Sequence, residues 1–274
     1  MYIKSVIFTL AKYETQYIEE FVIYHIGIGI SHIYIYDNED MPTYKNILNK
    51  YVQEEKVTVI HYPGNNYQKG VQQVIMDDFT SKYMNEKNNT HAVGIDIDEF
   101  IVLKKHKNIN DFIKEFINGD VAGITMNWRF FGSSNNKEND FRPVTERFIN
   151  REKGYSAHVK TIFDISKFSH FRCVHIIEPK KKYLIKDTNG NTIVHIAQNV
   201  NMINNEDHYI QLNHYSSKTF DEFMYQRKRG VCDKTTNQQK FDVAKLELLF
   251  KHRDRNEIED LLAHNIYKSI TNII

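Results

Sequence analysis

Two aspartates stand two residues apart, directly after an apolar run of the sequence. The run His91–Ile95 reads as a β-strand, and Asp96 and Asp98 follow it. In extended backbone, residues two apart point to the same side, and paired carboxylates repel each other unless a cation neutralises them. Their hard oxygen ligands suit Mn²⁺ or Mg²⁺, which commonly bind through one or two carboxylates plus substrate phosphates. The spacing therefore predicts metal ligation by Asp96 and Asp98.

Alternating strand and helix patterns precede this pair and must position it. Apolar runs predict strands over 3–10, 32–36, 56–61 and 91–95, and helical periodicity predicts helices over 14–28, 42–51 and 68–83. Parallel strands need crossover connections, so this order indicates an α/β fold with a sheet wrapped by helices. Ligands of such sheets lie beyond the carboxyl ends of the strands. By that rule Thr9, Glu14 and Asp37 border the same crevice as the two aspartates.

The order of elements beyond residue 100 is less regular. The patterns predict a helix over 110–117, strands over 122–131, 158–165, 171–177 and 209–215, and a hairpin over 180–196. A capping box from Thr219 to Glu222 opens a further helix, and two helices near 239–251 and 256–269 follow. The polar loop 132–140 reads as a mobile flap. We expect one mixed-sheet domain over 1–235, with halves 1–103 and 104–235, and a helical C-terminal extension over 236–274.

Composition excludes several classes of protein. The chain has 274 residues, 41% of them apolar, and its 36 basic and 35 acidic residues leave a net charge of +1. That balance argues against a disordered protein and against a dedicated nucleic-acid binder. The two cysteines, Cys173 and Cys232, exclude a disulfide framework. No signal peptide or membrane-spanning run is visible, so we expect a soluble cytoplasmic protein, of an oligomeric state that the sequence does not give.

The string Asp96-Ile97-Asp98-Glu99-Phe100 resembles the DxDEF signature of the family-92-like glycosyltransferases. Other segments resemble this family in the same order along the chain: Lys12–Glu14, Glu20–His25, His32–Asn38, Trp128–Ser133, His158–Lys160, Asn213–Tyr215 and Arg229-Gly230. The chain departs from the family at three positions. Tyr13 replaces the usual Asn, Phe21 replaces the usual Trp, and Gln226 replaces a frequent Lys.

This resemblance implies a GT-A-like, Rossmann-type fold and a metal-dependent glycosyltransferase. Such an enzyme moves a sugar from a nucleoside diphosphate sugar, here expected to be a UDP-sugar, to a hydroxyl of a glycan, lipid or protein. A bound Mn²⁺ or Mg²⁺ ion stabilises the leaving diphosphate as a Lewis acid. We expect Asp98 to bind the ion directly and Asp96 to contact the ribose or complete the ligand shell. The resemblance implies His214 as a further metal ligand.

Other side chains are expected around the donor. Fixed cations suit a diphosphate, the single tryptophan suits a sugar-stacking face, and residues at strand ends suit the base and ribose. The expected nucleotide-sugar-binding residues are Thr9, Glu14, Asp37, Asp96, Trp128, Arg129, Lys160 and Arg229. Glu14 fits the first turn of a helix equally well, and Asp37 fits a turn. Each of the three cations also fits a solvated surface.

The general base is the least determined of the predicted groups. The resemblance implies inversion at the anomeric carbon, which requires deprotonation of the acceptor hydroxyl, a role worth about 10² to 10⁴ in rate. Glu146, after the polar loop, is the expected base and, with Asp98, an expected catalytic residue; Glu178 and Asp233 stay open.

Two other functions compete with glycosyl transfer. One is a metal-dependent phosphohydrolase or nucleotidyltransferase that uses the two aspartates. A phosphohydrolase with an Asp-x-Asp nucleophile usually carries that motif on its first strand, whereas here it follows the fourth. The other is an inactive glycan-binding module on the same fold.

Overall fold

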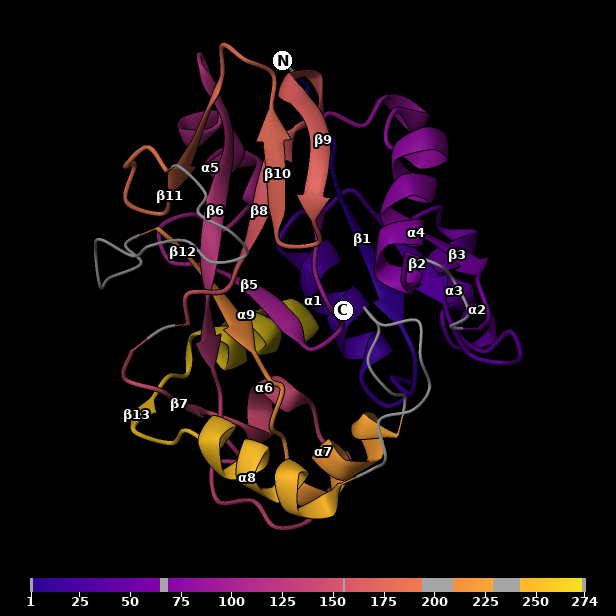
Figure 1. Cartoon of the computed structure of the whole chain (residues 1–274), viewed down its shortest axis with the longest axis vertical. Helices are drawn as coiled ribbons and strands as arrows, with labels where there is room; N and C mark the ends of the chain where they lie inside the picture. Colours follow the sequence, from indigo (N-terminus) through magenta and orange to yellow (C-terminus); the bar gives the residue numbers. More distant parts are fainter. Residues whose placement is uncertain (1, 65–68, 155, 194–208, 229–241, 273–274) are drawn as a thin grey trace.

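The computed structural model describes residues 2–64, 69–154, 156–193, 209–228 and 242–272. Its centre is a nine-stranded mixed sheet in the order β3-β2-β1-β4-β8-β6-β12-β5, with β11 pairing to β6 (Figure 1). The strands are β1 (Ser5–Ala11), β2 (His32–Asp37), β3 (Val57–His61), β4 (His91–Gly94), β5 (Glu99–Leu103), β6 (Val121–Phe130), β8 (Val159–Asp164), β11 (Leu184–Asp187) and β12 (Ile210–His214).

The first half of the sheet is parallel because a helical segment follows each of its first three strands. The helices are α1 (Ile18–Gly27), α2 (Tyr44–Ile47), α3 (Asn49–Gln53) and α4 (Val71–Asp78), which continues into a π-helical turn over Phe79–Tyr83. Side chains alternate across β1, so Ile7 enters one apolar core and Val6 and Phe8 enter another. The sheet is thus buried on both faces, as parallel strands require.

The second half of the sheet is antiparallel in part. Strand β8 runs against both β4 and β6, β12 runs parallel to β6, and β5 runs against β12. Two small sheets lie outside the main one: β9 (Phe168–Cys173) pairs with β10 (Ile176–Pro179), and β7 (Asn150–Arg151) pairs with β13 (Ile258–Glu259). The remaining helices are α5 (Ile109–Phe116), α6 (Val144–Arg147), α7 (Phe220–Arg227), α8 (Val243–Arg253) and α9 (Leu262–Thr271).

The C-terminal helices pack against the body of the molecule. Helix α8 contacts α7, and α9 contacts α1, α6 and β5. Gly27, the last residue of α1, allows this approach, because a Cβ atom there would collide with the side chain of Ile270. Helices α8 and α9 lie in the region expected to form a C-terminal helical extension, and α9 completes the core over α1.

The predicted mixed α/β fold is confirmed, with corrections of detail. The strand expected over 171–177 is two strands, β9 and β10, joined by a tight turn. The turn at Asn189-Gly190 forms around the Asp187 carboxylate, which accepts hydrogen bonds from the N–H groups of Asn189 and Asn191. The strand before it, β11, pairs with β6, and over the described residues the chain returns antiparallel to β11 at Lys186 and Thr192, as the expected hairpin requires.

The polar loop expected over 132–140 is held to the C-terminal segment. The N–H of Ser133 donates to Asp254 Oδ1 at 2.6 Å, and the N–H of Ser134 donates to Asn256 Oδ1 at 2.7 Å. Across the described ranges, no helix is long and apolar enough to cross a membrane.

Candidate active site

Strand direction brings the predicted residues to one edge of the sheet. Strands β1, β2, β4, β6 and β12 run one way, and β8 and β5 run the other. The carboxyl ends of the first group therefore meet the amino ends of the second. This edge gathers the end of β6 at Trp128, the end of β12 at His214 and the start of β8 at Lys160. Asp96 and Asp98 lie in the turn between β4 and β5 at the same edge.

Asp96 and Asp98 occupy a tight turn, and not the extended backbone that the sequence suggested. The N–H of Glu99 donates to the carbonyl of Asp96 at 3.0 Å, and the N–H of Asp96 donates back to Glu99 Oε2 at 3.0 Å. The turn gives the two aspartates different partners, so their roles are separable.

Asp96 pairs with a completely buried lysine. Lys160 Nζ lies 3.2 Å from Asp96 Oδ2 and 3.7 Å from Glu99 Oε2. Although burial favours the neutral acid, the Lys160 charge lowers the pKa of Asp96 below its ordinary value. Burial raises the pKa of Glu99 well above its ordinary value, and Lys160 only partly opposes this. Lys160, expected to bind the donor diphosphate, lies against Asp96, which keeps about a third of its side chain exposed.

Asp98 faces the histidine at the end of β12. His214 Nε2 lies 3.5 Å from Asp98 Oδ1, and both side chains are largely buried. Burial lowers the pKa of His214, while Asp98 opposes that shift. The Nδ1 atom of His214 is buried and has no hydrogen-bond partner among the residues that the structure describes. The structure thus brings together the two side chains that the sequence interpretation named as metal ligands besides Asp96.

An aromatic and imidazole group borders this pair. The Trp128 ring lies 4.3 Å from the His214 ring and stacks on His158 at 4.9 Å, with His175 at 5.3 Å on its edge. Burial lowers the pKa of His175 to about 4, and Lys160 adds to the shift, so His175 is neutral at pH 7. Trp128, expected to form a sugar-stacking face, stands beside the cluster, and among the described residues its buried indole Nε1–H has no hydrogen-bond partner.

Several neighbours escaped the sequence interpretation. His158, His175, Glu99 and Arg253 were not singled out. Arg253 lies over the ring of Phe130, with its guanidinium carbon 5.7 Å from the ring centroid. Burial lowers the pKa of Arg253, and the nearby Asp98 charge opposes this. The strand pattern carried one usable signal: residues two apart on β6 share a face, which places Phe130 beside Trp128 and next to β12.

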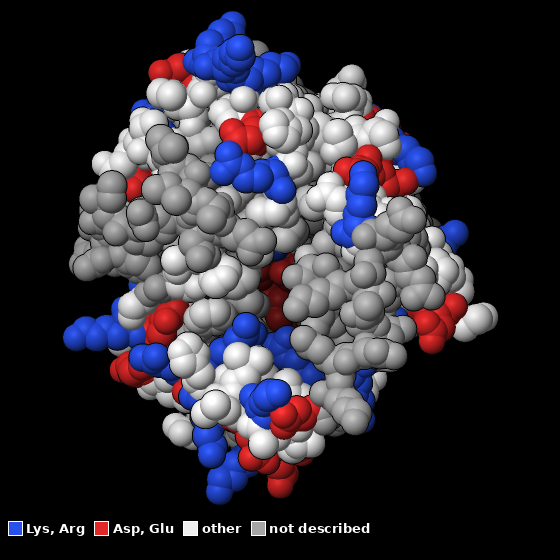
Figure 2. Space-filling model, viewed as in Figure 1, with Lys and Arg blue, Asp and Glu red and all other residues white. Residues whose placement is uncertain are grey.

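Seven of the fourteen buried polar atoms that lack a hydrogen-bond partner among the described residues belong to the residues around this edge. Buried polar groups normally find partners in a folded protein, so a local cluster of exceptions points to an absent polar ligand. The atoms are Thr9 Oγ1, Glu99 Oε1, Trp128 Nε1, His214 Nδ1, Ser216 Oγ, Ser217 Oγ and Lys218 Nζ. Four of them belong to one short segment, 214–218, which leaves the end of β12. Figure 2 shows a hollow near the centre of this face of the molecule, with acidic atoms at its floor and Lys or Arg atoms along its lower border.

The described residues do not form a preassembled metal centre. Within the described ranges, no group of three or more His, Cys, Asp or Glu side chains is placed to hold a metal ion. Asp98 and His214 nevertheless offer an oxygen and a nitrogen donor to one space, and Asp96 is balanced by Lys160. This donor set fits a divalent ion that takes its remaining ligands from a substrate diphosphate.

The residues predicted at the ends of β1 and β2 lie near this edge with defined partners. Thr9 and Asp96 line one small cavity. Glu14 is buried, and both its carboxylate oxygens accept from Gln226 Nε2 at 3.1 Å. Asp37 accepts from the N–H groups of Glu39, Thr43 and Tyr44, so it holds the turn into α2. These contacts match the turn role left open for Asp37 and tie Glu14 to α7.

Three further predicted residues stand apart from the cluster. Arg129 lies between Trp128 and Phe130 on β6 and donates to the carbonyl of Gly154. Glu146 is exposed on α6, where Arg142 Nη1 donates to it at 2.7 Å. Glu178 on β10 is paired with Arg172. Arg229 and Asp233 lie outside the described residues.

Comparison with known proteins extends the sequence resemblance. The model of Glycosyltransferase family 92 matches residues 3–246. The search of curated proteins found no match.

Among solved structures, S. aureus TarS shares 12% identity at a TM-score of 0.37, over 60% of this chain and 29% of that chain. S. aureus TarS 1-349 in complex with UDP shares 9% identity at a TM-score of 0.43, over 98% of this chain and 71% of that chain. A putative glucose-1-phosphate thymidylyltransferase from Bacillus anthracis, in complex with a sucrose, shares 12% identity at a TM-score of 0.32. This match covers 99% of this chain and 95% of that chain. The chain thus spans less than a third of the longer TarS chain, and these likenesses are too distant to carry a functional assignment.

Proposed function

The chain belongs to Glycosyltransferase family 92, and from this premise we propose that it takes its sugar from a nucleoside diphosphate sugar, with UDP as the carrier, bound at the Asp98–His214 edge of the sheet. The observation that carries the proposal is the set of buried polar atoms without partners at this edge. Such atoms cost free energy until a ligand pairs them. A diphosphate sugar offers acceptors for hydroxyl and ammonium groups and hydroxyls for carboxylates.

The segment Ser216–Lys218 is the proposed diphosphate contact. The side chains of Ser216, Ser217 and Lys218 are almost completely buried, and within the described ranges their polar atoms lack hydrogen-bond partners. Lys218 Nζ lies 4.5 Å from the centroid of the Tyr17 ring. A ring face holds a cation in place but leaves its N–H groups unpaired. A phosphate oxygen would pair with them through a charge-assisted hydrogen bond. Lys218 would thus supply the positive charge that is missing at position 226, where this chain has Gln in place of the family's frequent Lys.

Asp98 and His214 are the proposed ligands of Mn²⁺ or Mg²⁺. When bound, such an ion supplies Lewis-acid stabilisation of the leaving diphosphate. The lowered pKa of His214 keeps its imidazole neutral at pH 7 and able to donate a lone pair. Lys160 holds Asp96 ionised and oriented, and about a third of the Asp96 side chain stays exposed toward a ribose or the ligand shell.

Inversion is proposed for the transfer, with a carboxylate on the acceptor side as base. Glu146 and Glu178 are the described candidates for this base, and they contact Arg142 and Arg172 respectively. Glu146→Gln and Glu178→Gln separate them: the variant without its base should lose about 10² or more in transfer rate. Hydrolysis of the donor by water should change much less in that variant.

A thermal shift assay tests the donor and the metal together. UDP or Mn²⁺ alone should stabilise the protein little, and both together should raise the melting temperature, because each completes the site of the other. A ligand at about 100 times its Kd adds about 2.7 kcal/mol to the free energy of unfolding. A screen of nucleotide sugars with Mn²⁺ then reads release of nucleoside diphosphate. Equal shifts with and without Mn²⁺, or release of inorganic phosphate in place of the diphosphate, would overturn the proposal.

A further inference from the structure

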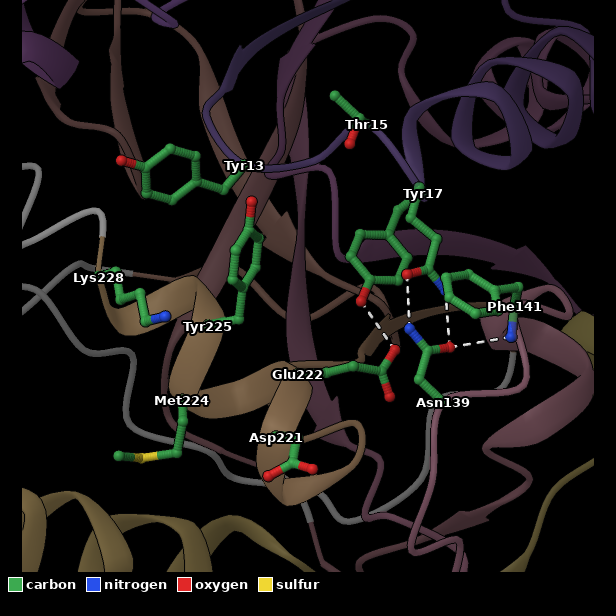
Figure 3. Close-up of a pocket in the computed structure, with 11 residues that line it drawn as sticks. Tyr13, Thr15, Tyr17, Asn139, Phe141, Asp221, Glu222, Met224, Tyr225 and Lys228 are labelled. Atoms are coloured by element: carbon green, nitrogen blue, oxygen red, sulfur yellow. Dashed lines mark hydrogen bonds between the residues drawn. The ribbon is translucent and has the colours of Figure 1, made fainter.

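A cavity of about 790 Å³ opens beside α7, apart from the Asp98–His214 pair. Its lining comes from the segment after β1, from the loop that precedes α6, and from α7 itself. Figure 3 shows Tyr13 and Tyr225 on one side of the cavity and Tyr17 and Phe141 on the other. A volume of this size is typical of small-molecule sites, which lie in the range of about 300 to 1,000 Å³.

Two of these aromatic residues adopt strained backbone conformations. Tyr13 has a φ of 61° and Phe141 a φ of 62°, in the left-handed region that bulky side chains avoid. Phe141 is also 77% exposed and Tyr225 is 50% exposed, so neither contributes a buried side chain to the core. Strain of this kind persists at functional sites, where it fixes a side chain for a ligand. The two outliers flank one cavity, which points to a site that uses aromatic faces.

The charges of the lining do not suit a diphosphate. Glu222 is neutralised by Arg147, whose Nη2 lies 2.7 Å from its carboxylate, so its charge is already balanced. Asp221 and Lys228 are exposed and oppose each other in sign. The cavity therefore carries little net charge, whereas anion sites gather cations.

The remaining polar groups suit a neutral ligand rich in hydroxyls. Gln16 and Asn139 exchange two hydrogen bonds, of 2.9 and 2.7 Å, which holds their amide groups across the two loops. Aromatic rings beside fixed amides and a carboxylate can pack against the apolar face of a sugar and hydrogen-bond its hydroxyls. A carbohydrate meets this description better than a nucleotide or a fatty chain.

The cavity is connected to the donor edge through two strands. The segment after β1 carries Tyr13 and Tyr17, and α7 begins six residues after His214 at the end of β12. The Tyr17 ring lies under Lys218 Nζ, and its hydroxyl donates to Glu222 at 2.7 Å. Resting on the proposed donor site, we propose that this cavity binds the acceptor and that the acceptor is a glycan, seated between Phe141 and the Tyr13–Tyr225 ring pair.

Saturation-transfer NMR tests the inference with defined sugars. The probes are methyl β-D-glucoside, methyl β-D-galactoside, methyl α-D-mannoside, lactose, cellobiose and maltose, each in separate titrations against the full chain. The proposal expects at least one probe to bind the wild type. Phe141→Ala and Tyr225→Ala should weaken that probe roughly two- to tenfold, as expected for loss of an aromatic contact. Tyr2→Ala, at an exposed tyrosine that precedes β1, is the matched control and should change nothing.

The same variants distinguish this inference from the donor proposal. Both aromatic variants should keep the joint UDP and Mn²⁺ thermal shift, because neither residue belongs to the donor edge. If they lose that shift, the cavity is part of the donor site and the inference is wrong. Absence of binding by all six probes, or binding that both variants leave unchanged, also overturns it, whatever the UDP result.

Discussion

Lys160 Nζ lies 3.2 Å from Asp96 Oδ2, at the base of a turn whose other aspartate, Asp98, faces His214. The two acids of one short motif therefore do different work. The charge of Asp96 is balanced by the protein itself, whereas Asp98 meets an imidazole that burial keeps neutral. Asp98 and its partner His214 are therefore the pair at which we expect an incoming cation to bind.

Replacement of Asp98 by Asn should abolish the joint stabilisation by UDP and Mn²⁺. The amide keeps the shape of the side chain and removes the charge that a divalent ion needs. We expect transfer to fall by about 10² to 10³, the usual effect of losing one stabilising group for developing charge. Thermal shift and donor turnover measure the two effects. Asp111→Asn, at an exposed position on α5, is the control, and an undiminished shift in Asp98→Asn would remove Asp98 from the site.

Replacement of Lys160 by Met should destabilise the fold by about 3 to 5 kcal/mol, because it leaves the Asp96 carboxylate next to a buried acid without a cation. Urea unfolding at pH 7 measures this free energy. The exposed Lys114→Met change should stay within about 0.5 kcal/mol. A cost below about 1 kcal/mol for Lys160→Met would contradict the assigned pairing.

Glu99→Gln should cost less than about 1 kcal/mol, in contrast to Lys160→Met. Burial raises the pKa of Glu99 well above its ordinary value, so the neutral acid is favoured. The glutamine keeps a carbonyl oxygen for the N–H of Asp96, which now binds Glu99 Oε2. Urea unfolding of the two variants side by side checks the contrast. A large loss in Glu99→Gln would mean that Glu99 acts as a buried anion beside Lys160.

Lys218→Met should raise stability and lower donor affinity. The buried ammonium lacks hydrogen-bond partners in the described chain, so its removal relieves a desolvation cost that outweighs the contact with the Tyr17 ring. We expect a gain of about 1 kcal/mol or more in the free energy of unfolding. Loss of a charge-assisted bond to diphosphate should weaken UDP binding about tenfold or more. A variant that is both less stable and unchanged in UDP binding would show that Lys218 is structural.

The stability of the fold should decrease as the pH falls below about 6.5. His25 is completely buried; its Nδ1 donates to the Phe21 carbonyl at 2.9 Å and its Nε2 accepts from the Ile101 N–H. Burial lowers its pKa to about 3, whereas an unfolded histidine titrates near 6.5. Between these values the unfolded chain binds the proton and the folded chain does not, so His25 costs about 1.4 kcal/mol per pH unit.

Urea unfolding between pH 4.5 and 7 checks this dependence. A His25→Gln variant should show a shallower slope than the wild type by about one proton, even if its stability at pH 7 is lower. His252→Gln, at an exposed histidine of α8, serves as the control. Identical slopes for wild type and His25→Gln would contradict a neutral buried imidazole.

Much of the fold was predictable because its signals are local. Apolar alternation located the strands, and the Thr219–Glu222 capping box is present in full. The direction of each strand in the second half of the sheet was harder to predict, because it depends on which strands pair. His158 and His175 reach Trp128 only because β8 lies between β4 and β6 and a turn joins β9 to β10. The contact of Glu14 with Gln226 joins residues 212 positions apart, and no local pattern marks such a pair.

The site residues also divide into those with a local sequence signal and those that depend on tertiary contacts. Asp98, His214 and Lys160 could be named because the family motif specifies them, and the structure gathers them. The segment Ser216–Lys218 could not, since serine and lysine are common surface residues and only their burial without partners distinguishes them. Glu146 was chosen for its place after a polar loop, and its contact with Arg142, four residues earlier, was not predicted.

The close packing of Ile270 against Gly27 determines when the protein can finish folding during its synthesis. Helix α9 covers α1 and β5, and the ribosome produces it after all the strands of the main sheet. Until it emerges, the nascent chain carries an uncovered apolar groove of the kind that favours aggregation. Folding of this enzyme is therefore expected to finish only after synthesis has passed residue 270, with chaperones shielding the groove in the interval.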